Sequence, residues 1–304
     1  MRLNPFSFHK WCVSSVASAF VAGSLILGSA AVQAAEVKEI KQTIEQNGTN
    51  LSVRANLMMA DGKTMQDDMV LLTHGTLTHM ERSTYAALQK NLAALGVSSL
   101  AINLSLGVDN RQGEYDCAVP HKHRHTDALQ EIGVWLDWLQ KQGANQVTLA
   151  GHSRGGNQTA WFVSENDSDA FEKVVLIAPA FEGPKPAEFL AKAQEMQKKG
   201  EGQSMINGID FIYCKDAQAT ADAVVSYYQD QSGYHTVELL KSAKKPTLVA
   251  IGSDDDVVAG LAEAVEPLVA SGKVSAVTIE DADHFFLDFA NEDLAAAIAE
   301  FVAE

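Results

Sequence analysis

Hydrophobic residues along this chain gather in short runs that contain no charged side chain. These runs lie at residues 69–73, 100–104, 147–150, 174–178 and 247–251. Uncharged runs rich in branched residues are typical of strands that are covered on both faces, as in a parallel sheet. Residues 51–58 instead alternate apolar and polar side chains, which predicts a half-buried strand near a sheet edge.

Between the runs, apolar side chains recur at the spacing of a helix. One such stretch covers residues 85–95 and stops at Gly96, and a second covers residues 129–139 and stops at Gly143. Residues 293–302 form a last amphipathic stretch. The alternation of strands and helices predicts an α/β fold, with a doubly wound, mostly parallel sheet and right-handed crossovers.

The segment at residues 181–240 is too long for a simple crossover between two strands. We expect a helical lid insertion here, with helices at residues 188–199 and 217–229, and a purely structural flap is the alternative. The large apolar side chains of the segment either line a pocket for an acyl group or form the core of the lid. These side chains are Met196, Met205, Phe211, Tyr213, Tyr227 and Tyr228.

The N-terminus has the pattern of a Sec-type signal peptide. Arg2 and Lys10 precede an apolar run at residues 13–27, and small residues lead to a cleavage site after Ala34. The run is interrupted by serine and glycine and is shorter than the roughly 20 residues of a spanning helix, so we expect no stable membrane anchor after cleavage. The expected mature domain is residues 35–304, located in the periplasm or secreted, with the periplasm as first choice.

Composition and charge exclude several classes of protein. Hydrophobic residues make up 46% of the chain and charged residues 20%, which excludes a disordered chain and a disulfide-dense mini-protein. The net charge of −16 argues against nucleic acid or an anionic membrane as a partner. A small-molecule substrate remains as the expected partner.

The candidate chemistry begins where the apolar run at residues 147–150 ends. The hexapeptide Gly-His-Ser-Arg-Gly-Gly at residues 151–156 follows this run and precedes a stretch that is compatible with a helix. The flanking glycines allow a sharp turn that projects Ser153 above the sheet as a nucleophile. The backbone N–H of Arg154, at the helix N-terminus, would then face a developing oxyanion.

In this motif and in two later ones the chain resembles the α/β-hydrolase fold family, whose catalytic residues follow in the order Ser, acid, His. Gly-Ser-Asp-Asp-Asp-Val-Val at residues 252–258 matches the family's acid motif and puts Asp255 in the catalytic slot. Asp254 and Asp256 are its near competitors. His284 lies on the loop before the last helix, where the family has its catalytic histidine.

The stretch Thr-His-Gly-Thr that ends at Thr76 is similar to the family's oxyanion loop. The resemblance implies that the N–H of Thr76, with Leu77 as fallback, completes an oxyanion hole together with Arg154. It also implies that His74 and His152 are structural neighbours of the site without a role in proton transfer.

The resemblance implies an exported serine hydrolase that needs no cofactor. Ser153, His284 and Asp255 would act through an acyl-enzyme intermediate. We expect a carboxylic ester hydrolase that acts on a small or medium acyl substrate. A serine peptidase or amidase of the same fold and a non-catalytic binding protein are the alternatives, and the oligomeric state is not predicted.

A separate group of three histidines alternates with two basic residues. The five residues are His121, Lys122, His123, Arg124 and His125. Three histidines on one face of an extended segment could bind zinc and form a metal-dependent hydrolase, which chelators would reveal. We favour instead a loop at the rim of the Ser153 pocket, whose cationic character would suit an anionic substrate.

Two cysteines lie beyond the signal, Cys117 beside the histidines and Cys214 in the insertion. In an oxidising compartment such a pair can form one disulfide. Two unrelated buried thiols are the alternative. A disulfide would tie the lid to the histidine loop across the pocket mouth.

Overall fold

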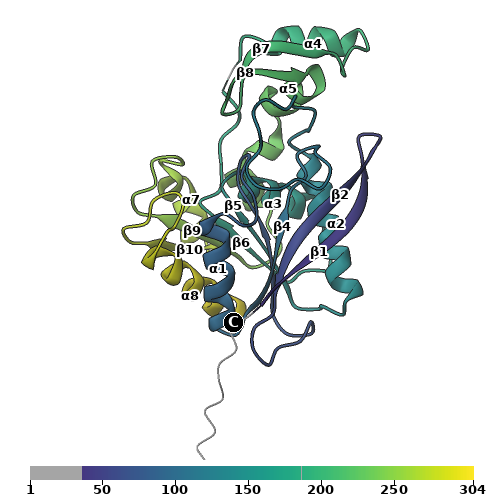
Figure 1. Ribbon diagram of the computed structural model, residues 1–304. Helices are drawn as coiled ribbons and strands as arrows, with labels where there is room; N and C mark the ends of the chain where they lie inside the picture. The colour runs from purple at the N-terminus through teal and green to yellow at the C-terminus, as the bar shows by residue number, and fades with distance from the viewer. Residues whose placement is uncertain (1–35, 186) are drawn as a thin grey trace, which may run out of the picture. The chain divides into compact units, whose positions relative to one another are not determined.

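A computed structural model describes residues 36–185 and 187–304, and the expected signal peptide lies outside this range. Eight of the described strands form one sheet (Figure 1). In spatial order they are β1 (Val37–Gln46), β2 (Thr49–Met58), β4 (Ser98–Asn103), β3 (Met69–Thr73), β5 (Val147–His152), β6 (Lys173–Ile177), β9 (Thr247–Gly252) and β10 (Ser275–Ile279). In this order the strands from β4 to β10 are parallel to one another, whereas β1 pairs antiparallel with β2 and β2 pairs antiparallel with β4. The prediction of a doubly wound, mostly parallel sheet is confirmed.

Strand β1 was not expected from the sequence. Most of its side chains are polar, most are exposed, and only Ile44 and Gln46 are buried, because β1 lies at the sheet edge. Asn47 and Gly48 join it to β2 with φ values of 50° and 76°. An Asn-Gly pair between two alternating stretches is a strong signal for a hairpin, so the sequence did contain the information.

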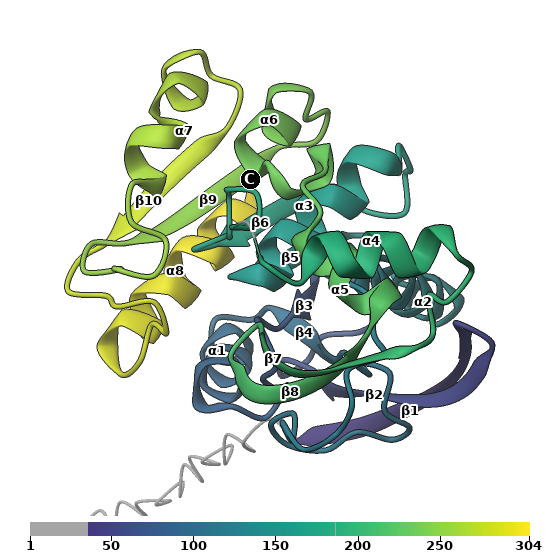
Figure 2. The ribbon, with the colours of Figure 1, turned by 90° about the horizontal axis from the view of Figure 1, so that it is seen from above.

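Helices cover both faces of the sheet (Figures 1 and 2). Helices α1 (Ser83–Ala94) and α8 (Phe289–Ala303) pack on one face, and α2 (Asp127–Lys141), α3 (Arg154–Glu165) and α7 (Leu261–Ala270) pack on the other. The inner strands are therefore buried on both sides, which explains their uncharged sequences. None of the helices in the described part of the chain is both long and apolar enough to cross a membrane.

The insertion after β6 differs from the expected bundle of helices. Its elements are α4 (Leu190–Lys198), the hairpin strands β7 (Met205–Phe211) and β8 (Cys214–Thr220), α5 (Ala221–Tyr228), the short 3-10 helix η1 (Ser232–Tyr234) and α6 (Thr236–Lys241). The expectation of a helix over residues 217–229 was wrong for residues 217–220, which belong to β8. The side chain of Thr220 accepts a hydrogen bond from the N–H of Ala223, so the helix begins only after this cap.

The insertion has its own small hydrophobic core. Phe211 and Val224 are fully buried there, and Leu77 and Tyr115 from two loops of the main domain complete the cluster. The insertion is therefore packed onto the loops at the carboxyl ends of the strands.

Candidate active site

Ser153 occupies a sharp turn between β5 and α3. Its backbone has φ 56° and ψ −122°, a conformation that non-glycine residues rarely adopt. Two glycines make the turn possible, because a Cβ atom at Gly151 would overlap the carbonyl of Gly155 and one at Gly155 would overlap the carbonyl of His74. The serine is therefore held on a strained turn at the carboxyl end of β5.

Ser153, His284 and Asp255 come together from three separate loops. Ser153 Oγ lies 2.9 Å from His284 Nε2, and His284 Nδ1 lies 2.7 Å from Asp255 Oδ2. The carboxylate can only accept, so Nδ1 carries the proton and Nε2 is left to accept a hydrogen bond from the serine hydroxyl. This arrangement orients a base toward the hydroxyl proton of Ser153.

The Asp255 carboxylate is fixed and ionised at neutral pH. Burial raises its pKa, but the hydrogen bond to His284 and the N–H groups of Val258 and Val257 outweigh burial, so the pKa is lowered from its ordinary value. Oδ1 accepts from Val257 N at 2.9 Å and from Val258 N at 3.1 Å. The competitors Asp254 and Asp256 are exposed, and His284 contacts neither of them.

The loops around Ser153 present backbone N–H groups as well. In the described residues no protein acceptor is found for the N–H of Thr76 or of Arg154. No acceptor is found among them for the N–H of Leu77 either, while its carbonyl accepts from Tyr115 N at 2.9 Å and its side chain packs into the core of the insertion. The open N–H groups therefore leave Thr76 as the candidate donor beside Arg154, with Leu77 as the fallback.

A buried hydrogen-bond chain that the sequence did not suggest connects the two sides of the site. Gly75 N donates to Tyr85 Oη at 2.8 Å, and Tyr85 Oη lies 2.8 Å from His152 Nδ1. His152 Nε2 in turn lies 2.7 Å from the carbonyl oxygen of His284. The only tautomer that satisfies all three contacts has Tyr85 donating to Nδ1 and Nε2–H donating to the carbonyl. In the sequence, the helical spacing of residue 85 indicated only a core position and gave no sign of a role at the site.

His74 and His152 remain neutral near pH 7. Burial lowers the pKa of both, to about 3 for His152, and the charge of Arg111 lowers that of His74 further. His74 Nδ1 lies 2.9 Å from the carbonyl of Gly75, and its Nε2 accepts from Leu104 N at 3.0 Å. Both rings therefore hold the backbone of neighbouring loops in place through hydrogen bonds to Gly75, Leu104 and His284.

Two adjoining hollows open around Ser153. The first, of about 700 Å³ with its open mouth, is lined by Ser153, His284, Thr76 and Tyr85 among others. The second, of about 1080 Å³, lies toward the insertion, and both hollows share Tyr213. A substrate whose carbonyl lies at Ser153 in the first hollow has space to extend past Tyr213 into the second.

The three histidines of residues 121–125 are buried, which corrects the expectation of a cationic loop. Burial lowers the pKa of each ring, to about 4 for His121, so they are neutral at pH 7. His121 Nδ1 lies 3.1 Å from His123 Nε2, and His123 Nδ1 lies 2.8 Å from Tyr227 Oη. Within residues 36–185 and 187–304, no group of three potential ligands has the geometry to hold a metal. Of the three, only His125 lines a hollow beside the serine.

The basic residues of the same loop do not supply a cationic rim either. Lys122 points to solvent, and Arg124 Nη2 lies 2.7 Å from Asp222 Oδ2. Neither residue lines the two hollows beside Ser153.

Cys117 and Cys214 form a disulfide. It joins the histidine loop to the start of β8, and the neighbouring pairing of His121 with Ala219 continues this connection. Tyr213, the residue before Cys214, lines both hollows. The bridge thus ties the insertion to the main domain at the entrance to the site.

The large side chains of the insertion divide between the two expected roles. Phe211 is fully buried in the core of the insertion, and Met196 packs against it. Tyr213 and Tyr228 line the second hollow, and Tyr227 does so while also belonging to the core.

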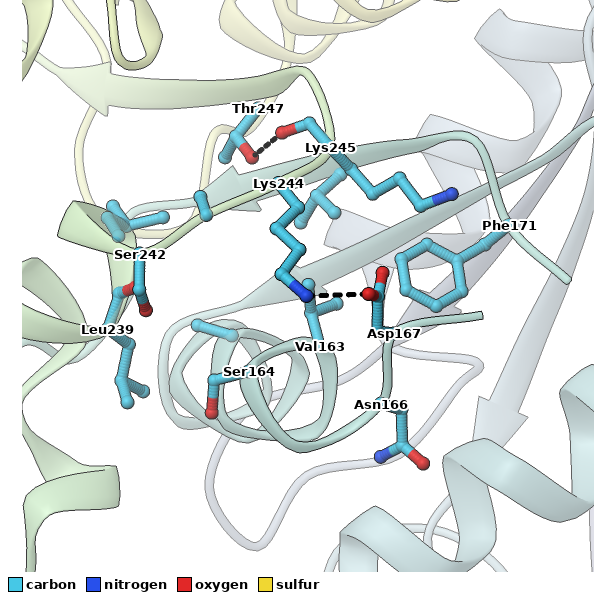
Figure 3. A pocket seen from close by; sticks show the side chains of 14 residues that line it. Val163, Ser164, Asn166, Asp167, Phe171, Leu239, Ser242, Lys244, Lys245 and Thr247 are labelled. Carbon is cyan, nitrogen blue, oxygen red and sulfur yellow. Dashed lines mark hydrogen bonds and ion pairs between the residues drawn. The ribbon is translucent and has the colours of Figure 1, made fainter. Parts of the chain in front are cut away.

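A third hollow lies away from Ser153, between the end of α3 and the segment that leads into β9 (Figure 3). It measures about 520 Å³, and an ion pair of 2.6 Å between Lys244 and Asp167 lies at its wall. None of the candidate catalytic residues lines it.

Solved structures with a similar fold include esterases and a lipase. Est1E from Butyrivibrio proteoclasticus, solved with ferulic acid bound, is 21% identical with a TM-score of 0.61, and the match covers 86% of this chain and 98% of Est1E. A monoacylglycerol lipase from Paleococcus ferrophilus is 17% identical with a TM-score of 0.58, covering 88% of this chain and 98% of the lipase. A hyperthermophilic esterase from Pyrobaculum calidifontis is 17% identical with a TM-score of 0.56, covering 87% and 85% of the two chains.

The comparison with curated proteins gives no match. Residues 70–297, from β3 to within α8, match the alpha/beta hydrolase family. The match covers most of the chain and includes all three residues of the Ser153 site. The chain therefore belongs to the alpha/beta hydrolase family.

Proposed function

We propose that this chain is a serine hydrolase that cleaves carboxylic esters through an acyl-enzyme. One observation carries the proposal: Ser153 Oγ lies 2.9 Å from His284 Nε2, while Asp255 holds the opposite ring nitrogen at 2.7 Å. A serine on a strained turn, a base within reach and a carboxylate behind the base are the parts that nucleophilic catalysis requires.

The proposed reaction has two halves. His284 Nε2 takes the hydroxyl proton while Ser153 Oγ bonds to the ester carbonyl carbon, and collapse of the tetrahedral intermediate breaks the bond to the alcohol. The alcohol leaves with the proton from His284. Water then loses a proton to His284 and attacks the acyl carbon, which releases the carboxylic acid and returns the proton to Ser153.

The unpaired N–H groups of Thr76 and Arg154 support an oxyanion hole in this reaction. Donors that are already oriented stabilise the charge on the carbonyl oxygen without further reorganisation. Arg154 also begins α3, so the helix dipole has the favourable sign for a negative oxygen. We propose these two backbone groups as the donors.

Ester hydrolysis is favoured over amide hydrolysis by the folds that this chain resembles. The three solved structures described above are two esterases and a lipase, and the ferulic acid bound to Est1E is a carboxylic acid, the class of product that an esterase releases. A peptidase or amidase would use the same triad with a pocket for an amine leaving group.

Labelling with a fluorophosphonate probe tests the nucleophile. We expect labelling of the wild type and of Ser271→Ala, a serine after α7 that lies outside the site, and none of Ser153→Ala. Hydrolysis of p-nitrophenyl acetate should follow the same pattern and should not change with a chelator. A folded wild type that neither labels nor turns over esters would favour a binding protein, and loss of activity with chelator would favour a metal-dependent hydrolase.

We also propose that the chain is exported and cleaved after Ala34. The charged, apolar and small residues of the N-terminus support this, and so does the Cys117–Cys214 disulfide, which suits an oxidising compartment. Cell fractionation with mass spectrometry should find a periplasmic protein that begins at Ala35. A cytoplasmic protein that retains its first residues would contradict the proposal.

A further inference from the structure

The second hollow beside Ser153 carries a positive charge in an acidic protein. Its charged lining consists of Arg154, Lys185 and Glu182, and His125 in the same wall is neutral at pH 7. The lining therefore carries one net positive charge, whereas the whole chain carries −16. A local positive charge in an otherwise acidic protein favours the binding of a negatively charged ligand.

The Arg154 guanidinium is held in place without being neutralised. Its Nε donates to Thr76 Oγ1 at 2.9 Å, and its Nη1 lies 3.5 Å from His125 Nδ1. Among the described residues, no carboxylate lies within 4.0 Å of it and no acceptor is found for Nη2. A fixed guanidinium with an open N–H edge is suited to bind a carboxylate in a defined geometry.

The surroundings of His125 explain why this ring leaves the charge of Arg154 intact. Asn157 Nδ2 donates to the carbonyls of Gly233 and Tyr234, so Asn157 Oδ1 must accept from His125 Nε2 at 3.0 Å. With its proton on Nε2, His125 offers only a lone pair at Nδ1. The ring supports the guanidinium as a neutral acceptor.

Tyrosine rings form the other walls of this hollow. Tyr227 Oη lies 2.8 Å from His123 Nδ1, Ile212 N donates to Tyr228 Oη at 2.7 Å, and Tyr234 Oη donates to a backbone carbonyl. The hydroxyl groups are thus engaged with the protein, and the rings are left to contact a ligand. Flat, unsaturated groups pack well against such rings.

We propose that this hollow, which we call the Arg154 subsite, selects esters that carry a free carboxylate on an aromatic ring. The ester carbonyl lies at Ser153, the ring packs against the tyrosines, and the carboxylate pairs with Arg154. A single net positive charge in the lining suits a monoanion. The inference rests on the proposed function, because it takes Ser153 as the point of attack.

Matched esters that differ only in charge test the Arg154 subsite. On the acyl side, p-nitrophenyl 4-carboxybenzoate is compared with p-nitrophenyl 4-carbamoylbenzoate, and on the alcohol side, 4-carboxyphenyl acetate with 4-carbamoylphenyl acetate. We expect kcat/KM of the wild type to favour the carboxylate in one pair by about tenfold or more, the effect of one charge-assisted contact. In Arg154→Gln the ratio of kcat/KM between the carboxylate and the carbamoyl ester should fall to about 1. Arg154→Lys should give an intermediate ratio, because the positive charge stays while the paired N–H donors of the guanidinium are lost.

Lys198→Gln is the matched control, since it removes one exposed positive charge on α4 outside the subsite. It should leave the ratio of the wild type unchanged. The Arg154 subsite is disproved if both pairs show no preference for the carboxylate, or if the preference survives in Arg154→Gln. Turnover of the carbamoyl esters in that case shows that the proposed function still stands.

Binding measured without turnover separates the two proposals further. Ser153→Ala should bind monomethyl terephthalate, a monoanionic ester, in calorimetry, and the double variant with Arg154→Gln should bind it about tenfold more weakly. Equal binding by both proteins would overturn the subsite. A wild type that is not labelled and hydrolyses none of the four esters would overturn the proposed function, whatever the binding measurement gives.

Discussion

The Tyr85 hydroxyl joins the backbone of Gly75 to the ring of His152, which in turn holds the carbonyl oxygen of His284. Tyr85→Phe removes the acceptor of Gly75 N and the donor to His152 Nδ1. Each hydrogen bond contributes about 1 kcal/mol, so we expect kcat for p-nitrophenyl acetate to fall about tenfold or more while KM changes little. Steady-state kinetics of the folded variant measures both values.

Tyr115→Phe deletes the same atom outside the site. The hydroxyl of Tyr115 makes only long contacts of 3.4 and 3.3 Å, to the carbonyls of Val119 and Pro120. We expect kcat within about twofold of the wild type, because no loop of the site depends on these contacts. An equal fall of kcat in the two variants would mean that Tyr85 acts through general packing.

Three consecutive aspartates differ in what they touch, and only Asp255 contacts His284. Asp255→Asn should lower kcat by about 10³ to 10⁴, because an amide does not hold the required tautomer or stabilise the charged ring. Asp254→Asn and Asp256→Asn should stay within a few-fold of the wild type, since both side chains are exposed. If Asp254→Asn or Asp256→Asn lost most of its kcat while Asp255→Asn kept it, the assignment of Asp255 as the acid would be contradicted. Kinetics of the three variants on one neutral ester decides the matter.

At the scale of elements, the approach of α3 to the loop after β3 depends on a glycine. A Cβ at Gly155 would overlap the carbonyls of His74 and Thr73, so Gly155→Ala should lower the free energy of unfolding by about 1–3 kcal/mol or more. Gly133→Ala is the matched control in α2, because its Cβ would lie 3.5 Å from Phe162. It should be neutral or raise stability by up to about 1 kcal/mol through helix propensity. Urea denaturation gives both values, and equal changes would contradict the close contact at the turn.

The insertion and the main domain are linked covalently by the disulfide. The bridge closes a span of 97 residues. The Cys117→Ser/Cys214→Ser variant should lose about 2–5 kcal/mol of unfolding free energy relative to the oxidised wild type. A reductant should lower the stability of the wild type toward that of the variant and leave the variant unchanged, as thermal and urea unfolding would show. A wild type insensitive to reductant would contradict this prediction.

At the scale of the whole molecule, buried neutral histidines set the response to acid. They are His74, His121, His123, His125 and His152. Burial lowers the pKa of each, whereas an unfolded histidine titrates near about 6.5. Below that pH the unfolded chain binds more protons than the folded one, so the free energy of unfolding decreases as the pH falls.

Two buried acids oppose this trend. Burial raises the pKa of Glu131 to about 7 and that of Asp127 above its ordinary value, so both favour the folded state as the pH falls. The histidines outnumber the acids. We therefore expect the free energy of unfolding to decrease by a net amount on the order of 3–6 kcal/mol between pH 6.5 and pH 5. Urea denaturation across this pH range measures the decrease. The His121→Gln variant should show a smaller change of unfolding free energy with pH. Stability that is constant or rises toward pH 5 would contradict the prediction.

The sequence by itself determined the fold class and the residues that meet at Ser153. Uncharged runs alternating with helical periods predicted the parallel sheet, because strands buried on both faces tolerate no charge. The resemblance to the α/β-hydrolase family assigned Asp255 and His284, and both follow strands whose carboxyl ends lie at the same edge of the sheet as the end of β5 before Ser153. These are local patterns, which is why they can be read from one chain.

Only the tertiary structure decided what depends on contacts between distant segments. Residues 217–220 form a strand because β7 supplies a partner, which no local preference reveals. The histidines at 121–125 are neutral because side chains of the insertion such as Phe211 and Tyr227 bury them. Tyr85 matters because its hydroxyl contacts Gly75 and His152. The positive charge beside Ser153 comes from Arg154 and Lys185, since burial and pairing removed the charges that the histidine loop was expected to supply. Burial and pairing are properties of the packed molecule, so the charge of the site emerged only there.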